Sequence, residues 1–296
     1  MSNRTFVLCA AAAVTAGAFV LRAPAQAPAV VKHLGLTAEQ KEILGHMSIV
    51  DLPDGAGGTT KTLRITGINV QVVNGLGATA TTNGLGNLIV GYQELGNEVE
   101  ADARTGSHYV VVGREHNYKS FGGIVAGESN IVENEFASAA GGRRNRANGR
   151  WSAITGGGHN YTAGDDAVVV GGTFNLALSG DSVVVGGAGN RAEAAGAGGA
   201  GAKAVVVGGY DNQSKGQGSV VVGGRYNTTT ANYSAILAGT SNSCIGDPQG
   251  NGSFCAIVGG EGNSTTPTHA AVVSGGSART ASGPHDWVAG GLLEDL

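Results

Sequence analysis

A fifteen-residue repeat runs through most of this 296-residue chain and limits what the chain can fold into. Each copy has a small residue, a β-branched run, Gly-Gly, two variable residues and Asn, as in residues 182–190 (SVVVGGAGN). The anchoring residues are Asn117, Asn130, Asn145, Asn160, Asn175, Asn190, Asn212, Asn227, Asn242 and Asn263. Six of their nine intervals are 15 residues, and the others are 13, 22 and 21. Such a period predicts a solenoid, because each copy buries its apolar side only against its neighbours.

The length of the repeat sets the geometry of one coil. At about 3.3 Å per strand residue, fifteen residues accommodate two short strands and two tight turns. The Val runs suit strands, and the glycines, 53 in all, suit turns that need a positive φ. We therefore predict an all-β fold, a parallel β-roll or β-solenoid of about a dozen stacked coils. The anchoring Asn side chains are expected to stack into a hydrogen-bonded ladder.

The Val triplets of the repeat predict self-association. In a strand, Val183 and Val185 point one way and Val184 the other, so both faces of the strand are apolar. A coil of two strands has an interior on only one of these faces. The other face is a long apolar stripe, which soluble monomers rarely leave exposed. We expect several copies of the chain to associate through it as a homo-oligomer.

The repeats, of the form SxVxGGxxNxAxG, resemble the YadA-like head of trimeric autotransporter adhesins over roughly residues 85–291. The resemblance implies a left-handed parallel β-roll, three chains per head, and binding to host or matrix surfaces. Such adhesins continue into a coiled-coil stalk and a membrane-barrel anchor, whereas residues 290–296 (GGLLEDL) contain no heptad. The expectation is an anchorless head, secreted or loosely associated with a surface.

The N-terminal part of the chain differs from the repeats. Arg4, an apolar stretch and the Ala25-Gln26-Ala27 tripeptide are typical of a secretory signal peptide. Thr37 and Gln40 form a capping box for a short helix, and residues 62–66 and 68–72 are expected to be strands that cap the first coil. The expected organisation is a signal peptide at 1–27, a helix and capping strands at 28–84, the repeat domain at 85–291 with insertions near 191–203 and 243–254, and a tail at 292–296.

Two cysteines remain after removal of the signal peptide. Cys244 and Cys255 are an even count in an exported chain, and export favours disulfide formation. We predict a disulfide between them, with two free thiols as the alternative.

The sequence contains no recognisable catalytic constellation, and no cofactor or metal site is expected. Residues 196–201 match G-x-G-x-x-G, but the match lacks the strand–turn–helix context that phosphate binding requires. His116 and His159 are interpreted as solvated turn residues, and Asp165-Asp166 as a charged turn. One basic cluster is a candidate patch for an acidic glycan or matrix polymer, with a solvated turn as the alternative: Arg143, Arg144, Arg146 and Arg150.

These observations favour a secreted, non-enzymatic structural or adhesive rod that presents variable turn residues. A β-helical polysaccharide lyase or hydrolase is one alternative, and a passive matrix or sheath component is another. A net charge of −4 and 5% aromatic residues argue against nucleic acid as a partner. No stretch after the signal peptide has the length of a membrane-spanning helix, so no membrane insertion is expected.

Overall fold

The computed structural model describes residues 35–193, 203–246, 254–266 and 270–289. The chain divides into two compact units, with the boundary between Gln71 and Val72. The predicted signal peptide at 1–27, the G-x-G-x-x-G match at 196–201 and the tail at 292–296 lie outside the described residues.

The first unit contains the predicted helix and a β-hairpin. Helix α1 (Ala38–Gly45) begins after Thr37, whose side chain accepts a hydrogen bond from the Gln40 N–H, while the Gln40 side chain accepts one from the Thr37 N–H. This capping box confirms the predicted N-cap. Strands β1 (Met47–Pro53) and β2 (Thr59–Ile65) pair antiparallel.

The predicted strand at 62–66 is correct in part, and the one at 68–72 is wrong. Residues 59–65 form β2, whereas residues 68–72 have no regular secondary structure. The partner of β2 is β1, and the carboxylate of Asp54 accepts hydrogen bonds from the N–H groups of Ala56 and Gly58 in the connecting turn. An Asp that bonds the backbone two residues on favours such a tight turn, which brings the two strands together.

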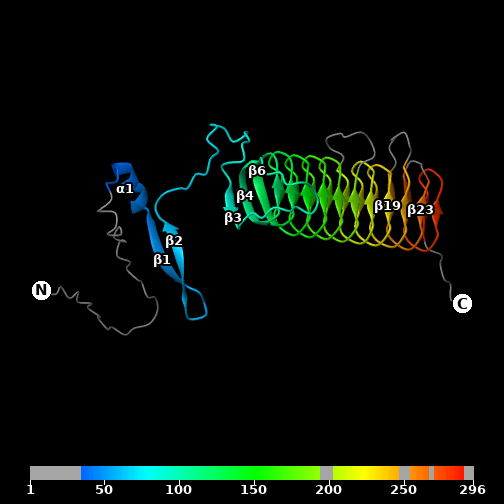
Figure 1. Cartoon of the computed structure of the whole chain (residues 1–296). Helices are drawn as coiled ribbons and strands as arrows, with labels where there is room; N and C mark the ends of the chain where they lie inside the picture. The colour runs from blue at the N-terminus through cyan, green and yellow to red at the C-terminus, as the bar shows by residue number, and fades with distance from the viewer. Residues whose placement is uncertain (1–34, 194–202, 247–253, 267–269, 290–296) are drawn as a thin grey trace, which may run out of the picture. The chain divides into compact units, whose positions relative to one another are not determined.

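The second unit is the predicted parallel β-solenoid (Figure 1), in which every strand pairs in parallel with the equivalent strands of neighbouring coils. The 13-stranded sheet contains β3 (Leu88–Val90), β4 (Ser107–Arg114), β6 (Phe121–Glu128), β8 (Ser138–Ala139), β10 (Ala153–Ile154), β12 (Val168–Val169), β14 (Val183–Val184), β16 (Val205–Val206), β18 (Val220–Val221), β20 (Ala235–Ile236), β22 (Cys255–Ile257), β24 (Ala271–Val273) and β26 (Trp287–Val288). The 11-stranded sheet contains β5 (Asn117–Tyr118), β7 (Ile131–Val132), β9 (Arg146–Ala147), β11 (Tyr161–Thr162), β13 (Leu176–Ala177), β15 (Arg191–Ala192), β17 (Gln213–Ser214), β19 (Thr228–Thr229), β21 (Ser243–Cys244), β23 (Ser264–Thr265) and β25 (Thr280–Ala281).

From β4 to β25 each coil has one strand in each sheet and two turns, whereas β3 and β26 have no counterpart in the 11-stranded sheet. We call the turn that leads from the 13-stranded to the 11-stranded sheet turn A, and the turn that leads back turn B. Turn A contains the Gly-Gly pair and ends at the anchoring Asn. The residue before that Asn has a positive φ, as at Phe174 (56°), and so does one residue of turn B, as at Asp181 (57°). Together with the positive φ of the Gly-Gly pair, as at Gly171 (117°) and Gly172 (76°), these residues reverse the chain within a few positions.

The interior of the solenoid is narrow, because each short strand directs one side chain into it from each of the two sheets. On strand β14, Val184 is fully buried and Val183 is half-buried, and Val185, which follows the strand, is 43% exposed. The opposite sheet supplies small residues to the same interior, such as Ala177 and Ala192 on strands β13 and β15. The alternation predicted for the Val triplets is therefore correct, and the core is a narrow column of aliphatic side chains.

The predicted Asn ladder lines the end of turn A. The N–H of each Asn from Asn145 to Asn263 donates to the Oδ1 of the ladder Asn one coil earlier, at 2.8–3.0 Å. Each Nδ2 also donates to carbonyls of its own turn and of the next coil, as in Asn175 to Gly171 and Gly187. The ladder thus satisfies buried backbone groups as well as stacking amides.

Asn117 is the exception to the predicted ladder. It pairs in register with Ile131 on strand β7, one position beyond the ladder, and its Nδ2 donates to Ala101. The ladder position of the first coil is held by His116, whose Nδ1 lies 3.2 Å from the N–H of Asn130 and whose Nε2 lies 3.0 Å from the Val112 carbonyl. The imidazole thus takes the place of an amide. His116 is fully buried, so its interpretation as a solvated turn residue is wrong.

Candidate functional site

The outer surface of the 13-stranded sheet carries two continuous rows of side chains. Row 1 holds the first outward residue of each strand, and row 2 holds the residue two positions later. Row 1 runs through Val110, Ile124, Ser138, Ala153, Val168, Val183, Val205, Val220, Ala235, Ala256, Val272 and Trp287. Row 2 runs through Val112, Ala126, Ala140, Thr155, Val170, Val185, Val207, Val222, Leu237, Val258 and Ser274. We call the two rows together the apolar face.

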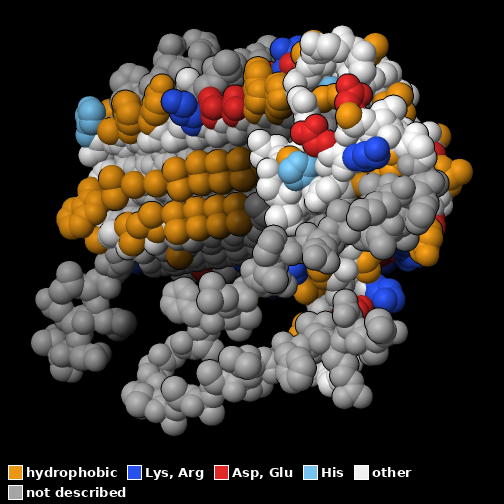
Figure 2. Space-filling model, turned by 90° about the vertical axis from the view of Figure 1, so that its left-hand side faces the viewer, with side chains coloured by type: hydrophobic (Ala, Val, Ile, Leu, Met, Phe, Trp, Pro, Cys, Tyr) orange, Lys and Arg blue, Asp and Glu red, His pale blue; other side chains and the backbone are white. Residues whose placement is uncertain are grey.

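No residue of either row is charged, and the rows appear as two parallel hydrophobic bands in Figure 2. The Val and Leu side chains of row 2 are between 37% and 47% exposed. The outward positions of the 11-stranded sheet differ, because they include Arg191, Gln213 and Thr228. Outward apolar residues occur on single strands of the 11-stranded sheet, such as Leu176 on β13, but form a continuous uncharged pair of rows only on the 13-stranded sheet.

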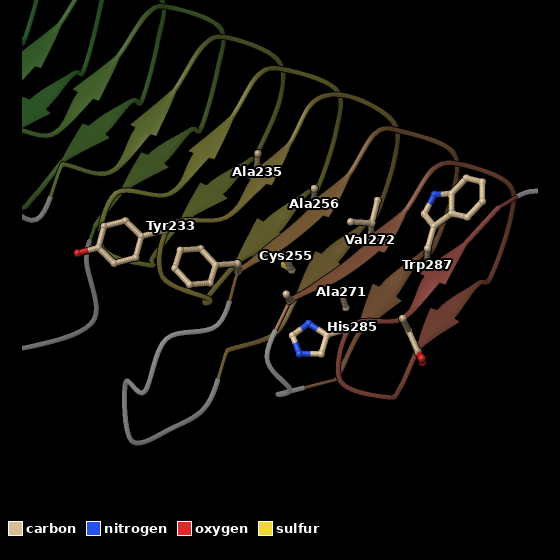
Figure 3. A pocket seen from close by; sticks show the side chains of 11 residues that line it. Tyr233, Ala235, Cys255, Ala256, Ala271, Val272, His285 and Trp287 are labelled. Atoms are coloured by element: carbon tan, nitrogen blue, oxygen red, sulfur yellow. The ribbon is translucent and has the colours of Figure 1, made fainter.

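A groove of about 490 Å³ deepens the apolar face towards its C-terminal end. Its floor includes Ala235 and Ala256, the small residues of row 1 that follow Val220. Figure 3 shows Tyr233 beside one end of the groove and Trp287 at the other, several coils away. Because the floor belongs to row 1, the groove is part of the apolar face rather than a separate cleft.

The walls of the groove come from the positive-φ position of turn B. The equivalent position in successive coils, two residues before row 1, is occupied by Tyr233, Phe254, Ala270 and His285, of which Phe254 alone does not have a positive φ. The rings of Tyr233 and Phe254 stack with centroids 5.9 Å apart. Sequence reasoning missed these residues. Their equivalent positions in successive repeats can be recognised only when the insertion at 243–254 is left out of the repeat alignment.

The four arginines predicted as a ligand patch do not form one surface: Arg143, Arg144, Arg146 and Arg150. Residues 143 and 144 lie in turn A, residue 146 lies on β9, and residue 150 lies in turn B. Arg144 pairs with Glu98, and the Nε of Arg146 donates to Glu133 at 2.7 Å. The four arginines are separated because the eight residues from Arg143 to Arg150 pass from one turn of the coil to the other.

Glu133 is the centre of an ion-pair network near the first coils. Lys119 donates to its Oε1 at 2.8 Å, and Arg146 donates to its Oε2. Burial works against the charged carboxylate, but the hydrogen bonds from Arg146 and Lys119 outweigh it and lower the pKa of Glu133 below its ordinary value. Since these charges compensate one another, the network favours a structural role over ligand binding.

The predicted disulfide between Cys244 and Cys255 is confirmed. It spans the interior from β21 to the start of β22 and closes the 243–254 insertion. Two coils earlier, the equivalent positions hold Ser214 and Ser219, whose hydroxyl oxygens lie 2.7 Å apart. The disulfide therefore occupies an interior position that elsewhere holds a pair of small polar residues.

Among the described residues, no group of three or more His, Cys, Asp or Glu side chains is placed to hold a metal ion. No helix in the described part of the chain is long and apolar enough to cross a membrane. Asp165 lies in turn B, where its carboxylate accepts a hydrogen bond from the Arg150 N–H at 2.9 Å. His159 is partly buried in turn A and stacks on Phe174.

Comparison with known proteins adds no assignment. No protein-family model matches the chain, and no match was found among curated proteins.

Proposed function

We propose that this protein is a secreted, non-enzymatic adhesive or structural rod that self-associates through the apolar face, as a homotrimer in its simplest form. The observation that carries the proposal is the pair of uncharged rows on one sheet, opposite a polar sheet. Burial of one Val is worth about 1.5–3 kcal/mol, so rows that continue over many coils provide a large driving force for association. Parallel copies around one axis would bring equal coil levels together.

The proposal extends the resemblance to trimeric autotransporter adhesin heads. In such an arrangement the apolar faces are covered, and the polar sheet and turn A remain available to an extracellular surface or matrix. The Cys244–Cys255 disulfide supports an oxidising compartment, where such bonds persist. Binding without turnover distinguishes this proposal from a polysaccharide-degrading enzyme.

The self-association is tested by measuring molar mass with light scattering coupled to size-exclusion chromatography. The wild-type chain should elute as an oligomer, three times the chain mass in the simplest form. Val185→Glu combined with Val207→Glu places charges in row 2 and should shift the protein towards monomer. Gln213→Glu is the matched control, because it adds a charge to an outward position of the opposite sheet in the same coil as Val207. A folded wild-type monomer would contradict the proposal.

The adhesive part is tested with immobilised extracellular glycans and matrix proteins. Saturable binding with no release of soluble fragments supports an adhesive rod. Depolymerisation of a polysaccharide would support the enzyme instead. Absence of binding to the whole panel would favour a passive matrix component.

A further inference from the structure

The residue before each ladder Asn forms a third row, at the crest of turn A. Successive coils place His159, Phe174, Gly189 and Asp211 at this position. The His159 and Phe174 rings stack with centroids 4.7 Å apart and planes 13° apart. Neighbouring parallel strands are about 4.8 Å apart, which matches the distance between the two ring centroids. The rings are therefore stacked along the axis of the solenoid. Phe174 therefore turns its second face towards the coil that contains Gly189.

The position next to that face is empty because Gly189 has no side chain. A Cβ added at Gly189 would meet no atom closer than 3.8 Å, and the nearest atoms all belong to Asp211. Phe174 is 60% exposed, although His159 covers its other face. The gap therefore leaves one aromatic face open at the surface.

Asp211 lies on the far side of the gap. Its N–H donates to the carbonyl of Ala188, which places it one coil beyond Gly189. Within the described residues, the Asp211 carboxylate has no hydrogen-bond or ion-pair partner. Asp211 and Phe174 are two coils apart, about 9.6 Å along the axis, which leaves room for one flat group between a ring face and a carboxylate. We call Phe174, Gly189 and Asp211 together the notch.

The two sides of the notch, the Phe174 ring face and the Asp211 carboxylate, together suit a planar cation. A guanidinium group stacks on an aromatic face and donates paired hydrogen bonds to a carboxylate. Turn A already holds such a group in this chain, since the guanidinium carbon of Arg225 lies 5.3 Å from the Tyr210 ring centroid and 4.7 Å from that of Tyr226. The notch offers similar chemistry but contains no cation of its own.

We propose that the notch binds an arginine side chain of a protein or peptide partner. This inference deepens the proposed adhesive function and rests on it, because it names the partner chemistry that turn A recognises. A lysine ammonium lacks the planar stacking surface, and a neutral sugar lacks the positive charge. Repetition around an oligomer axis would convert weak single contacts into avidity.

The experiment titrates the full oligomeric protein with blocked tripeptides while NMR follows the peptide signals. The probes are Ac-Gly-Arg-Gly-NH2, Ac-Gly-Lys-Gly-NH2 and a methyl pyranoside. We expect the Arg peptide to bind with a Kd of about 1 mM or weaker. The Lys peptide should bind about threefold to tenfold more weakly, because it forfeits the stacking contribution. The pyranoside should not bind at the notch.

Variants assign the binding to the notch. Phe174→Ala removes the stacking face, and Gly189→Asn fills the gap with a residue that tolerates a positive φ. Asp211→Asn removes the charge at constant shape. All three should weaken Arg-peptide binding by about tenfold or more, the change that 1.4 kcal/mol produces. Phe136→Ala is the matched control, because Phe136 is also exposed and has a positive φ (54°) but lies in turn B.

The possible outcomes separate the site from the wider proposal. Arg-peptide binding that Gly189→Asn leaves unchanged, or that Phe136→Ala weakens equally, overturns the notch. So does preferential binding of the pyranoside. If the protein is an oligomer and binds surfaces but ignores the Arg peptide, the notch is wrong and the adhesive function stands. If it binds no surface, the adhesive function fails whatever the peptide does.

Discussion

The backbone N–H of Asn175 donates a 3.0 Å hydrogen bond to the Oδ1 of Asn160, one coil earlier along the solenoid. The same Asn175 accepts from the N–H of Asn190 and donates to the carbonyls of Gly171 and Gly187. The buried Asn175 side chain therefore binds backbone groups of its own coil and of the next one, while its backbone N–H binds the Asn160 side chain of the coil before. This arrangement repeats wherever the ladder continues, and it ties each coil to the next.

Asn175→Ala should strongly destabilise the solenoid. It leaves the buried N–H of Asn190 and the Gly171 carbonyl without this partner, at about 1–3 kcal/mol for each unsatisfied group, whereas the Gly187 carbonyl keeps the Thr173 N–H. We expect the urea midpoint of unfolding, followed by circular dichroism, to fall clearly. Asn148→Ala is the control, because Asn148 is only partly buried and its Nδ2 donates to the Tyr161 hydroxyl at 3.2 Å. Equal losses in the two variants would contradict a special role of the ladder.

Adjacent glycines of turn A should respond oppositely to alanine. At Gly157, φ is +81° and an added Cβ would lie 2.1 Å from the Gly172 carbonyl oxygen of the next coil. Gly157→Ala must therefore separate two coils, and we expect loss of the folded state or a loss above about 3 kcal/mol. At Gly156 an added Cβ meets nothing within 4 Å. Gly156→Ala should be neutral or stabilising by up to about 1 kcal/mol, because it restricts the unfolded chain. Thermal unfolding of the pair measures the contrast.

His116 should make the stability of the solenoid sensitive to acid. Burial lowers the pKa of His116, and the hydrogen bond to the Val112 carbonyl offsets this only in part. Below the unfolded-state pKa of about 6.5 the unfolded chain binds a proton that the folded chain resists. His116 therefore contributes stability that is present above about pH 6.5 and is lost as the pH falls.

His116→Asn should reduce this acid sensitivity, since Asn is the residue that the other ladder positions use. The measurement compares urea unfolding of both proteins at several values between about pH 5 and 8. All other titrating groups are common to the two proteins, so the difference in slope isolates His116. Identical pH dependence would show that the buried imidazole does not resist protonation.

The disulfide should be replaceable by serines at a local cost. Cys244 and Cys255 occupy the positions that hold the hydrogen-bonded pair Ser214 and Ser219 two coils earlier. The double variant Cys244→Ser with Cys255→Ser should fold, and should lose up to about 3 kcal/mol through a freer unfolded loop. Hydrogen exchange in β21 and β22 should quicken, and dithiothreitol should affect only the wild type. A reductant-insensitive wild type would contradict a stabilising bond.

The repeat fold was predictable from the sequence because it is specified locally. Each fifteen-residue copy contains its own strands, glycine turns and ladder Asn, and the copies contact mainly their neighbours. The coil register and the alternation at Val183, Val184 and Val185 follow from position within the repeat, whereas the disulfide was predicted from the even cysteine count of an exported chain. The prediction was poorest where the period changes, as at Asn117, which is displaced by one residue from the ladder that His116 joins.

The tertiary structure decided which residues share a surface. Arg144 and Arg150 are close in sequence but lie in different turns, whereas Phe174, Gly189 and Asp211 are far apart in sequence and lie on one crest. Residues close in sequence do not share a surface here, because fifteen residues complete one full coil around the solenoid. The sequence alone determined the coil, its period and the apolar triplet. Only the stacking of coils placed one residue per turn side by side, and this created the apolar face, the groove and the notch.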